Sequence, residues 1–251
     1  MNNVTSIDDL KSQIANNYQQ VKERIAEACL RVHRSPEEVT LVVVTKGHSV
    51  ERIRCAIELG LNRFGENYVE EGSEKIEAIG QPKGIEWHMI GHIQSRKAEM
   101  VVQYFDVVHS LDSLKVARRL ERFATQKSKI VPVLLECNVS GEESKFGFFA
   151  SDPNAWDDLL PDFIEIAQLP HLEIRGLMTM APFYENPEHT RPVFRKLVEL
   201  QGYLRTRLPE VCWDELSMGM SSDFEVAIEE GATIVRIGQA ILGERPVSLG
   251  V

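Results

Sequence analysis

The sequence predicts an α/β protein built as a single (β/α)₈ TIM-like barrel with an extra helix at its amino end. First, short apolar or β-branched segments alternate with segments of helical composition, as in βα units around a parallel sheet. Second, eight such units fit into about 210 residues, near the usual size of this barrel. No Gly/Ser linker or Pro-rich stretch interrupts the 251 residues. We therefore expect one domain over residues 1–251, with the helix at about 6–34 and the barrel at about 40–245.

The extra helix is amphipathic. Its apolar residues recur at spacings of three and four: Ile7, Leu10, Ile14, Tyr18, Val21, Ile25, Cys29 and Val32. Ser6 and Asp9 form a candidate capping box at its start, and Ser35 with Pro36 ends it. A coiled coil is the alternative, but the heptads do not persist, so we expect this helix to pack on the barrel.

The barrel strands are predicted from short runs such as LVVVT and VPVLLECN, which have the apolar, β-branched composition of buried parallel strands. These strands cover residues 41–45, 63–66, 86–90, 107–109, 131–138, 173–180, 215–217 and 233–237. An open doubly wound sheet is the competing architecture. The first strand is not followed by G-x-G-x-x-G, the phosphate-binding turn of the dinucleotide-binding version of that sheet, so the barrel is favoured.

Helices are predicted between the strands where charged and apolar residues alternate with helical spacing. These helical segments cover residues 50–59, 68–79, 113–126, 187–208 and 223–230. Because each crossover helix returns the chain to the same end of the sheet, all the strands run in one direction. Their carboxyl ends therefore meet at one mouth, where such barrels place their active sites.

Composition excludes several classes of function. The formal net charge of −10 argues against nucleic acid as a partner, because phosphate backbones attract a basic surface. No apolar run approaches the ~18 residues needed to span a membrane, and the start MNNVTSIDDL lacks the features of a signal peptide. The four cysteines lie far apart, which suits a reducing cytoplasm. His88 and His92 fall about 13 Å apart on a strand, so no metal site is expected.

A lysine closes the first predicted strand. Lys46 follows LVVVT directly and should point into the barrel mouth, where partial desolvation lowers its pKa and leaves an amine free to form a Schiff base. A lysine that only reaches out to solvent is the alternative interpretation of the same position. His109, at the end of the fourth strand, is expected to be a polar residue of the mouth rather than a catalytic base.

The loops after the last two strands are typical of a phosphate site. The seventh strand runs into S-M-G-M-S-S-D from Ser217, where small residues, hydroxyls and free amides open a helix. The eighth strand ends with Arg236 followed by Gly238. Barrels often bind phosphate with these two loops. Together with Lys46 across the mouth, they indicate a phosphorylated carbonyl ligand, and pyridoxal 5′-phosphate (PLP) meets both requirements.

The chain also resembles the pyridoxal phosphate homeostasis protein family from about residue 41 to 245. Besides Lys46, the matching stretches are FGENYVEEG (64–72), EWHMIGHIQSRK (86–97), SGEESKFG (140–147), RGLMTM (175–180), SMGMSSDFEVAI (217–228) and RIGQAILG (236–243). The resemblance implies a PLP fold type III barrel, similar to the amino-terminal half of alanine racemase, with the cofactor held as an internal aldimine on Lys46. It further implies that Arg236 faces the pyridine nitrogen and that Asn67 lines the pocket. Around the phosphate it implies Ser217, Gly219, Met220, Ser221 and the backbone of Gly238.

The resemblance to this family allows two functions. An arginine at the pyridine nitrogen keeps that nitrogen unprotonated, so the ring withdraws electrons less strongly and transamination is disfavoured. We therefore expect a PLP-binding homeostasis protein without catalytic activity, acting as a cytoplasmic monomer that serves PLP-dependent apoenzymes. The alternative is an amino-acid racemase in which Tyr68 or His88 supplies a second acid/base group. A class I aldolase with a substrate Schiff base on Lys46 is a third hypothesis.

Overall fold

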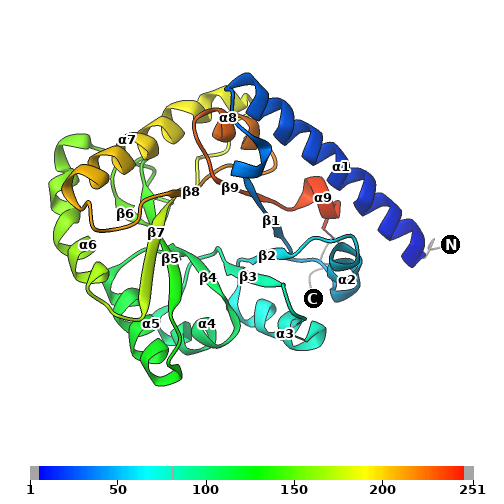
Figure 1. The fold of residues 1–251 in the computed structure, drawn as a ribbon, viewed down its shortest axis with the longest axis horizontal. Coiled ribbons are helices and arrows are strands. Elements are labelled where there is room, and N and C mark those ends of the chain that lie inside the picture. The colour runs from blue at the N-terminus through cyan, green and yellow to red at the C-terminus, as the bar shows by residue number, and fades with distance from the viewer. Residues whose placement is uncertain (1–5, 81, 246–251) are drawn as a thin grey trace.

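The computed structural model of the chain describes residues 6–80 and 82–245. Within these residues eight parallel strands close into one barrel, which confirms the predicted fold class (Figure 1). They are β1 (Thr40–Val44), β2 (Arg63–Glu66), β3 (Glu86–Met89), β4 (Val107–Leu111), β5 (Val131–Asn138), β7 (Leu172–Met178), β8 (Glu215–Ser217) and β9 (Ile234–Ile237). The first and last strands pair with each other, with Val43 opposite Ile237, so the chain closes the barrel at its own ends.

Helices surround the barrel on its outside (Figure 1). They are α2 (Val50–Glu58), α3 (Val69–Ile79), α4 (Ala98–Tyr104), α5 (Leu114–Lys127), α6 (Leu160–Ala167), α7 (Arg191–Arg207), α8 (Phe224–Glu229) and α9 (Gln239–Leu242). Short 3₁₀ turns join them: η1 (Pro36–Glu38), η2 (Ser95–Lys97), η3 (Pro153–Leu159) and η4 (Pro187–Thr190). Among the described residues, no helix is both long and apolar enough to cross a membrane.

The predicted strands agree with the observed ones to within two residues at each end. Three helices, α4, α6 and α9, were not predicted, and neither was β6 (Phe148–Phe149), which pairs with β5 outside the barrel. α4 has seven residues, α6 has eight and α9 has four, so each presents at most about two turns of periodic pattern. A proline also stands near the start of α6.

The extra helix, α1 (Ile7–Arg31), runs along the barrel's outer edge and packs on α2, α8 and α9 (Figure 1). Ser6 caps it, because the Ser6 hydroxyl accepts a hydrogen bond from the Asp9 amide at 3.1 Å. Its buried residues are Ile14, Val21, Ile25, Ala28 and Cys29. The predicted apolar face thus lies against α2, α8 and α9. The structure therefore contains a packed helix and not a coiled coil.

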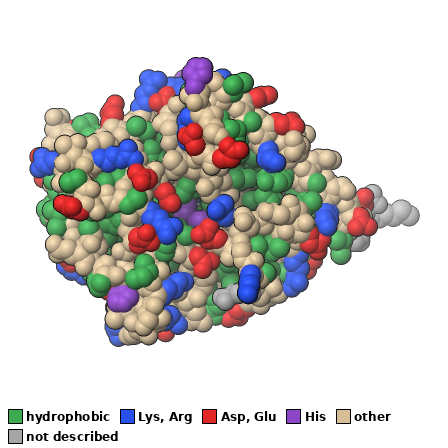
Figure 2. Space-filling view, viewed as in Figure 1, with side chains coloured by type: hydrophobic (Ala, Val, Ile, Leu, Met, Phe, Trp, Pro, Cys, Tyr) green, Lys and Arg blue, Asp and Glu red, His purple; other side chains and the backbone are tan. Residues whose placement is uncertain are grey.

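The barrel interior combines an apolar layer with polar side chains. The apolar layer contains Val42, Val107, Leu134, Met178 and Ile234, one residue from each of five strands. Acidic and basic side chains, with histidine between them, gather around a hollow at the centre of the face shown in Figure 2. Buried polar groups inside a barrel need hydrogen-bond partners.

Candidate functional site

A cavity of about 300 Å³ opens at the carboxyl ends of β1, β8 and β9. Its lining residues are Val44, Lys46, Asn67, Ile90, Met180, Phe183, Met220, Ser221, Ser222, Arg236, Gly238, Gln239 and Arg245. Six of the eight residues predicted from the sequence are in this list, namely Lys46, Asn67, Met220, Ser221, Arg236 and Gly238. The structure therefore brings residues from both ends of the chain to one cavity.

Lys46 lies in the turn after β1 and is partly buried. Burial lowers the pKa of its amine below the ordinary 10.5, and the nearby Arg245 lowers that pKa further, while Glu71 and Glu66 oppose the shift. The Lys46 amine also lies 5.6 Å from the centre of the Tyr68 ring. A lowered pKa increases the fraction of neutral, nucleophilic amine at pH 7, as Schiff-base chemistry requires.

A buried ion cluster beneath Lys46 fixes its turn. Lys75 on α3 donates hydrogen bonds to the Thr45 carbonyl, Glu66 Oε1 and Glu71 Oε1, each at 2.6 Å. Glu71 in turn accepts the amide hydrogen of Gly47 at 2.6 Å. Residues on both sides of Lys46 are thus anchored to α3, so the lysine has a fixed starting point for its side chain.

The loop after β8 presents free donors to the cavity. Among the described residues, the amides of Ser221 and Ser222 donate to no backbone carbonyl. Asp223 shapes the loop, because its carboxylate accepts the Met220 amide hydrogen at 2.6 Å. Gly219 has a φ of +91°, and a Cβ there would lie 2.6 Å from the side chain of Ala227, so only glycine fits. Free amides and hydroxyls in such a loop suit a phosphate group.

Arg236 lies on the floor of this cavity and is only 3% exposed. It donates hydrogen bonds to Ser217 Oγ at 2.6 Å and to the Thr179 carbonyl at 2.9 Å. Burial lowers the pKa of its guanidinium to about 10, and Glu136 and Asp223 oppose this shift, so the group is cationic at neutral pH. Ser217 itself is fully buried and Gly219 lies against α8, so neither is among the lining residues of the cavity. Their contact with a phosphate stays a prediction.

The structure corrects one sequence interpretation at the mouth. His109 was expected to be a polar residue of the mouth, but it is fully buried inside the barrel. It bonds there to His88 and to Ser217. The prediction failed because β4 continues to Leu111, which leaves His109 in the middle of the strand.

Sequence reasoning missed several lining residues: Val44, Ile90, Met180, Phe183, Ser222, Gln239 and Arg245. Arg245 stands two positions after the end of the stretch RIGQAILG and lies against Gly47, where an added Cβ would lie 3.2 Å from the Arg245 side chain. This closeness to a stretch that resembles the family was the sequence signal that could have identified Arg245. Phe183 is 80% exposed in the loop after β7, where nothing in the sequence distinguishes it from an ordinary loop residue.

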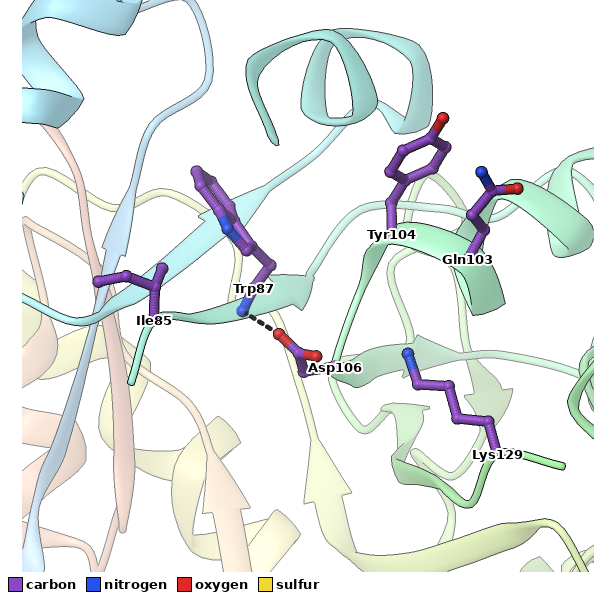
Figure 3. A pocket seen from close by; sticks show the side chains of 6 residues that line it. All are labelled: Ile85, Trp87, Gln103, Tyr104, Asp106 and Lys129. Carbon is purple, nitrogen blue, oxygen red and sulfur yellow. Dashed lines mark hydrogen bonds between the residues drawn. The ribbon is translucent and has the colours of Figure 1, made fainter. Parts of the chain in front are cut away.

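A second cavity, of about 280 Å³, lies near the amino ends of β3, β4 and β5 (Figure 3). Its polar groups already have structural partners. Asp106 accepts the backbone hydrogen of Trp87 at 2.8 Å, and Lys129 donates to the carbonyls of Val102 and Phe105. This end of a (β/α)₈ barrel usually serves stability rather than chemistry. The mouth cavity is therefore the candidate site.

Comparisons with known proteins show the family of this chain. The model of the alanine racemase N-terminal domain matches residues 11–246. A pyridoxal phosphate homeostasis protein of Escherichia coli K12 is 40% identical over 240 residues, covering 94% of this chain and 99% of the relative. The chain belongs to the pyridoxal phosphate homeostasis protein family.

Solved structures show the same barrel fold in two other proteins. The structure of PipY from Synechococcus elongatus PCC7942 with PLP bound matches with a TM-score of 0.76 and 34% identity, covering 89% of this chain and 100% of PipY. Alanine racemase of Clostridium difficile 630 matches with a TM-score of 0.68 and 16% identity, covering 94% of this chain and 58% of the racemase. The second match shows a shared fold, and the first extends to sequence.

Proposed function

We propose that this member of the homeostasis family binds PLP at the barrel mouth, attaches it to Lys46, and supplies or buffers the cofactor without turning over a substrate. One observation carries the proposal. A single cavity joins a partly desolvated amine, a loop with free amides and hydroxyls, and a buried guanidinium.

The residues present fit the chemical groups of PLP. Lys46 matches the aldehyde, the loop at Ser221 and Ser222 with the backbone of Gly238 matches the phosphate, and Arg236 matches the pyridine nitrogen. A cavity of about 300 Å³ lies at the lower end of the sizes that hold small ligands. When bound, PLP supplies an aldehyde that condenses with amines and a ring that withdraws electrons. Asn67 and Met220 complete the lining beside it.

The surroundings of the cavity support binding over catalysis. A cationic guanidinium beside the ring nitrogen disfavours its protonation, which weakens the ring as an electron sink. Racemisation needs a second acid/base group on the face of the cofactor opposite the lysine. Of the two candidates for this second group, Tyr68 lies beside Lys46 itself, and His88 is buried within the barrel. Curated relatives carry the name of homeostasis proteins, which agrees with this proposal.

The proposal extends to partners and place of action. PLP-dependent apoenzymes are the expected recipients, because a cofactor carrier needs proteins that take the cofactor up. The protein acts in the cytoplasm as a monomer in this proposal. The mouth is accessible, with Phe183 exposed at its rim, so cofactor can enter and leave without opening the barrel.

An absorbance spectrum with and without Lys46 tests this function. Wild-type protein incubated with PLP should show a band near ~420 nm that resists dialysis, the region typical of a PLP Schiff base. Lys46→Ala should lose the band. Lys11→Ala should keep it, because Lys11 lies on α1 and is not among the residues that line the cavity. Borohydride reduction followed by mass spectrometry should then place the label on Lys46.

The same preparation separates the alternative functions. Sustained racemisation of any amino acid that depends on Lys46 would replace the homeostasis proposal with the enzyme. A protein that stays colourless with PLP, and is trapped by borohydride only after a keto or aldehyde substrate is added, would indicate the aldolase.

A further inference from the structure

Four polar side chains form a continuous chain through the inside of the barrel. They are His88 on β3, His109 on β4, Ser217 on β8 and Arg236 on β9, each at most 3% exposed. His88 Nδ1 lies 2.8 Å from His109 Nε2, and His109 Nδ1 lies 2.8 Å from Ser217 Oγ. Arg236 donates to the same Ser217 oxygen at 2.6 Å. Because β4 and β8 are not neighbours in the sheet, the bond between His109 and Ser217 crosses the barrel interior.

Glu86, at the start of β3, lies at the opposite end of this chain. Its carboxylate Oε2 is 3.5 Å from His88 Nε2, which makes no hydrogen bond among the described residues. The Glu86 carboxylate also accepts a hydrogen bond from Arg63 at 3.0 Å, and its side chain is 37% exposed. The nearby His88 ring, together with the hydrogen bond and charge of Arg63, holds the pKa of Glu86 at about 2. A fixed anion therefore stands at the base and a fixed cation at the mouth.

The donors and acceptors give this chain one direction. Arg236 has only donors, so Ser217 Oγ accepts from it. The serine hydrogen is then free to donate to His109 Nδ1, His109 Nε2 donates to His88 Nδ1, and the hydrogen on His88 Nε2 faces Glu86. Each of the three hydrogen bonds has one donor and one acceptor when both imidazoles are neutral and carry their hydrogen on Nε2. Reversing the chain would leave the lone pair of His88 Nε2 facing the carboxylate.

Burial and the nearby charges favour the neutral form of His109. Burial holds the pKa of His109 well below its usual range, and the neighbouring His88 and Arg236 lower it further. Glu136 on β5 and Asp223 before α8 face Arg236. Asp112, after β4, in turn raises the pKa of Glu136.

We propose that His88, His109 and Ser217 are positioning residues: they hold the guanidinium of Arg236 toward the cofactor's ring nitrogen and couple it to Glu86 at the far end of the barrel. The geometric part stands on the apo-protein alone. Its consequence for the cofactor rests on the proposed function. The competing interpretation is a polar layer that only fills the barrel core.

Nitrogen NMR on the apo-protein tests the direction of the chain. Long-range ¹H–¹⁵N spectra should show His88 and His109 neutral at pH 7, each with its hydrogen on Nε2. Glu86→Gln removes the anion and should shift the ring nitrogen signals of both histidines. Glu215→Gln is the matched control, since Glu215 also lies inside the barrel base and, in the described chain, makes no hydrogen bond to either histidine. Hydrogens on Nδ1, or equal responses to the two variants, would overturn the proposed chain.

Release of PLP tests the effect on the cofactor. His109→Leu breaks the chain and should speed PLP dissociation at least tenfold and move the pH midpoint of the ~420 nm band. His109→Gln offers one acceptor and one donor and should recover most of both values. Circular dichroism and thermal unfolding establish that both variants are folded, and Glu86→Gln, at the partly exposed base, provides the same readout without a core substitution.

The outcomes distinguish the two proposals. If wild-type protein fails to bind PLP, the proposed function is wrong, while the NMR result still decides the direction of the chain. If PLP binds and folded His109→Leu releases it at the wild-type rate with an unchanged pH midpoint, the chain does not position Arg236. If His109→Gln behaves like His109→Leu, hydrogen bonding is not the cause.

Discussion

Glu136 shows how single buried charges set the pH response of this protein. It lies on β5, is 2% exposed, and faces the cation of Arg236. Burial, with a smaller contribution from the charge of Asp112, raises the pKa of Glu136 to about 7, although the cation of Arg236 opposes the rise. The folded protein therefore holds a proton on Glu136 at pH values where the unfolded chain has lost it.

Glu136→Gln should consequently remove part of the pH dependence of stability. A raised folded pKa contributes stability that is present below pH ~4.5 and is lost as the pH rises through about 7. Relative to the variant, the free energy of unfolding of the wild type should fall by up to about 3 kcal/mol between pH 5 and 8. Urea unfolding at several pH values measures this, with the exposed Glu173→Gln as control. Parallel curves for wild type and Glu136→Gln would contradict the assignment.

Lys75 is a second buried residue with charged partners. It is 7% exposed and contacts Glu66, which is fully buried. Lys75→Met would leave that carboxylate without its cation, so we expect a loss of about 3–5 kcal/mol in the free energy of unfolding. Adding Glu66→Gln to Lys75→Met should recover part of the loss, whereas Lys11→Met, at an exposed ion pair, should change little. A double variant as unstable as the single one would exclude the ion pair as the cause.

Among the helices, α1 contacts elements from both the first and the last part of the barrel, namely α2, α8 and α9. Ile14 is fully buried against the neighbouring elements, and Ile7, the first residue of the helix, is 66% exposed. Ile14→Ala should cost about 2–5 kcal/mol of unfolding free energy through lost burial and the cavity it leaves. Ile7→Ala should cost less than about 0.5 kcal/mol. Equal effects in thermal or urea unfolding would mean that the helix does not pack as described.

The sequence predicted the strands well because parallel barrel strands have short, dense apolar signals. Two kinds of element escaped. The helices α4, α6 and α9 are too short for a periodic pattern, and the two-residue β6 has no pattern at all. Their positions depend on tertiary contacts: β6, for example, exists only because Phe148 lies opposite Cys137 of β5.

The candidate site was predictable where residues lie at or just after the carboxyl end of a strand. Lys46 follows β1, Arg236 lies near the end of β9 and Gly238 follows β9, and each lines the cavity. Arg245 escaped because its place depends on how α9 turns the chain back toward Gly47. The role of Ser217 also escaped, since a contact across the barrel between β4 and β8 has no local signal in the sequence.

Within the whole molecule, other helices of the same chain cover the main apolar face of α1. Because α2, α8 and α9 pack against that face, α1 offers little apolar surface to a second copy. We therefore predict a monomer at micromolar concentration. Light scattering coupled to size-exclusion chromatography measures the mass directly, with 28.4 kDa expected for one chain. A mass twice that value would show that another surface mediates dimerisation.

Pairing between the first and last barrel strands has a consequence for synthesis of the protein. Lys46 follows the first strand, whereas Arg236 lies in the last strand and Gly238 follows it, so these residues become neighbours only when β9 joins β1. A chain still on the ribosome and shorter than β9 has the lysine but neither Arg236 nor Gly238. The proposed cofactor site therefore forms only after β9 has been synthesised, and we expect PLP to be retained only by a chain that has reached that strand.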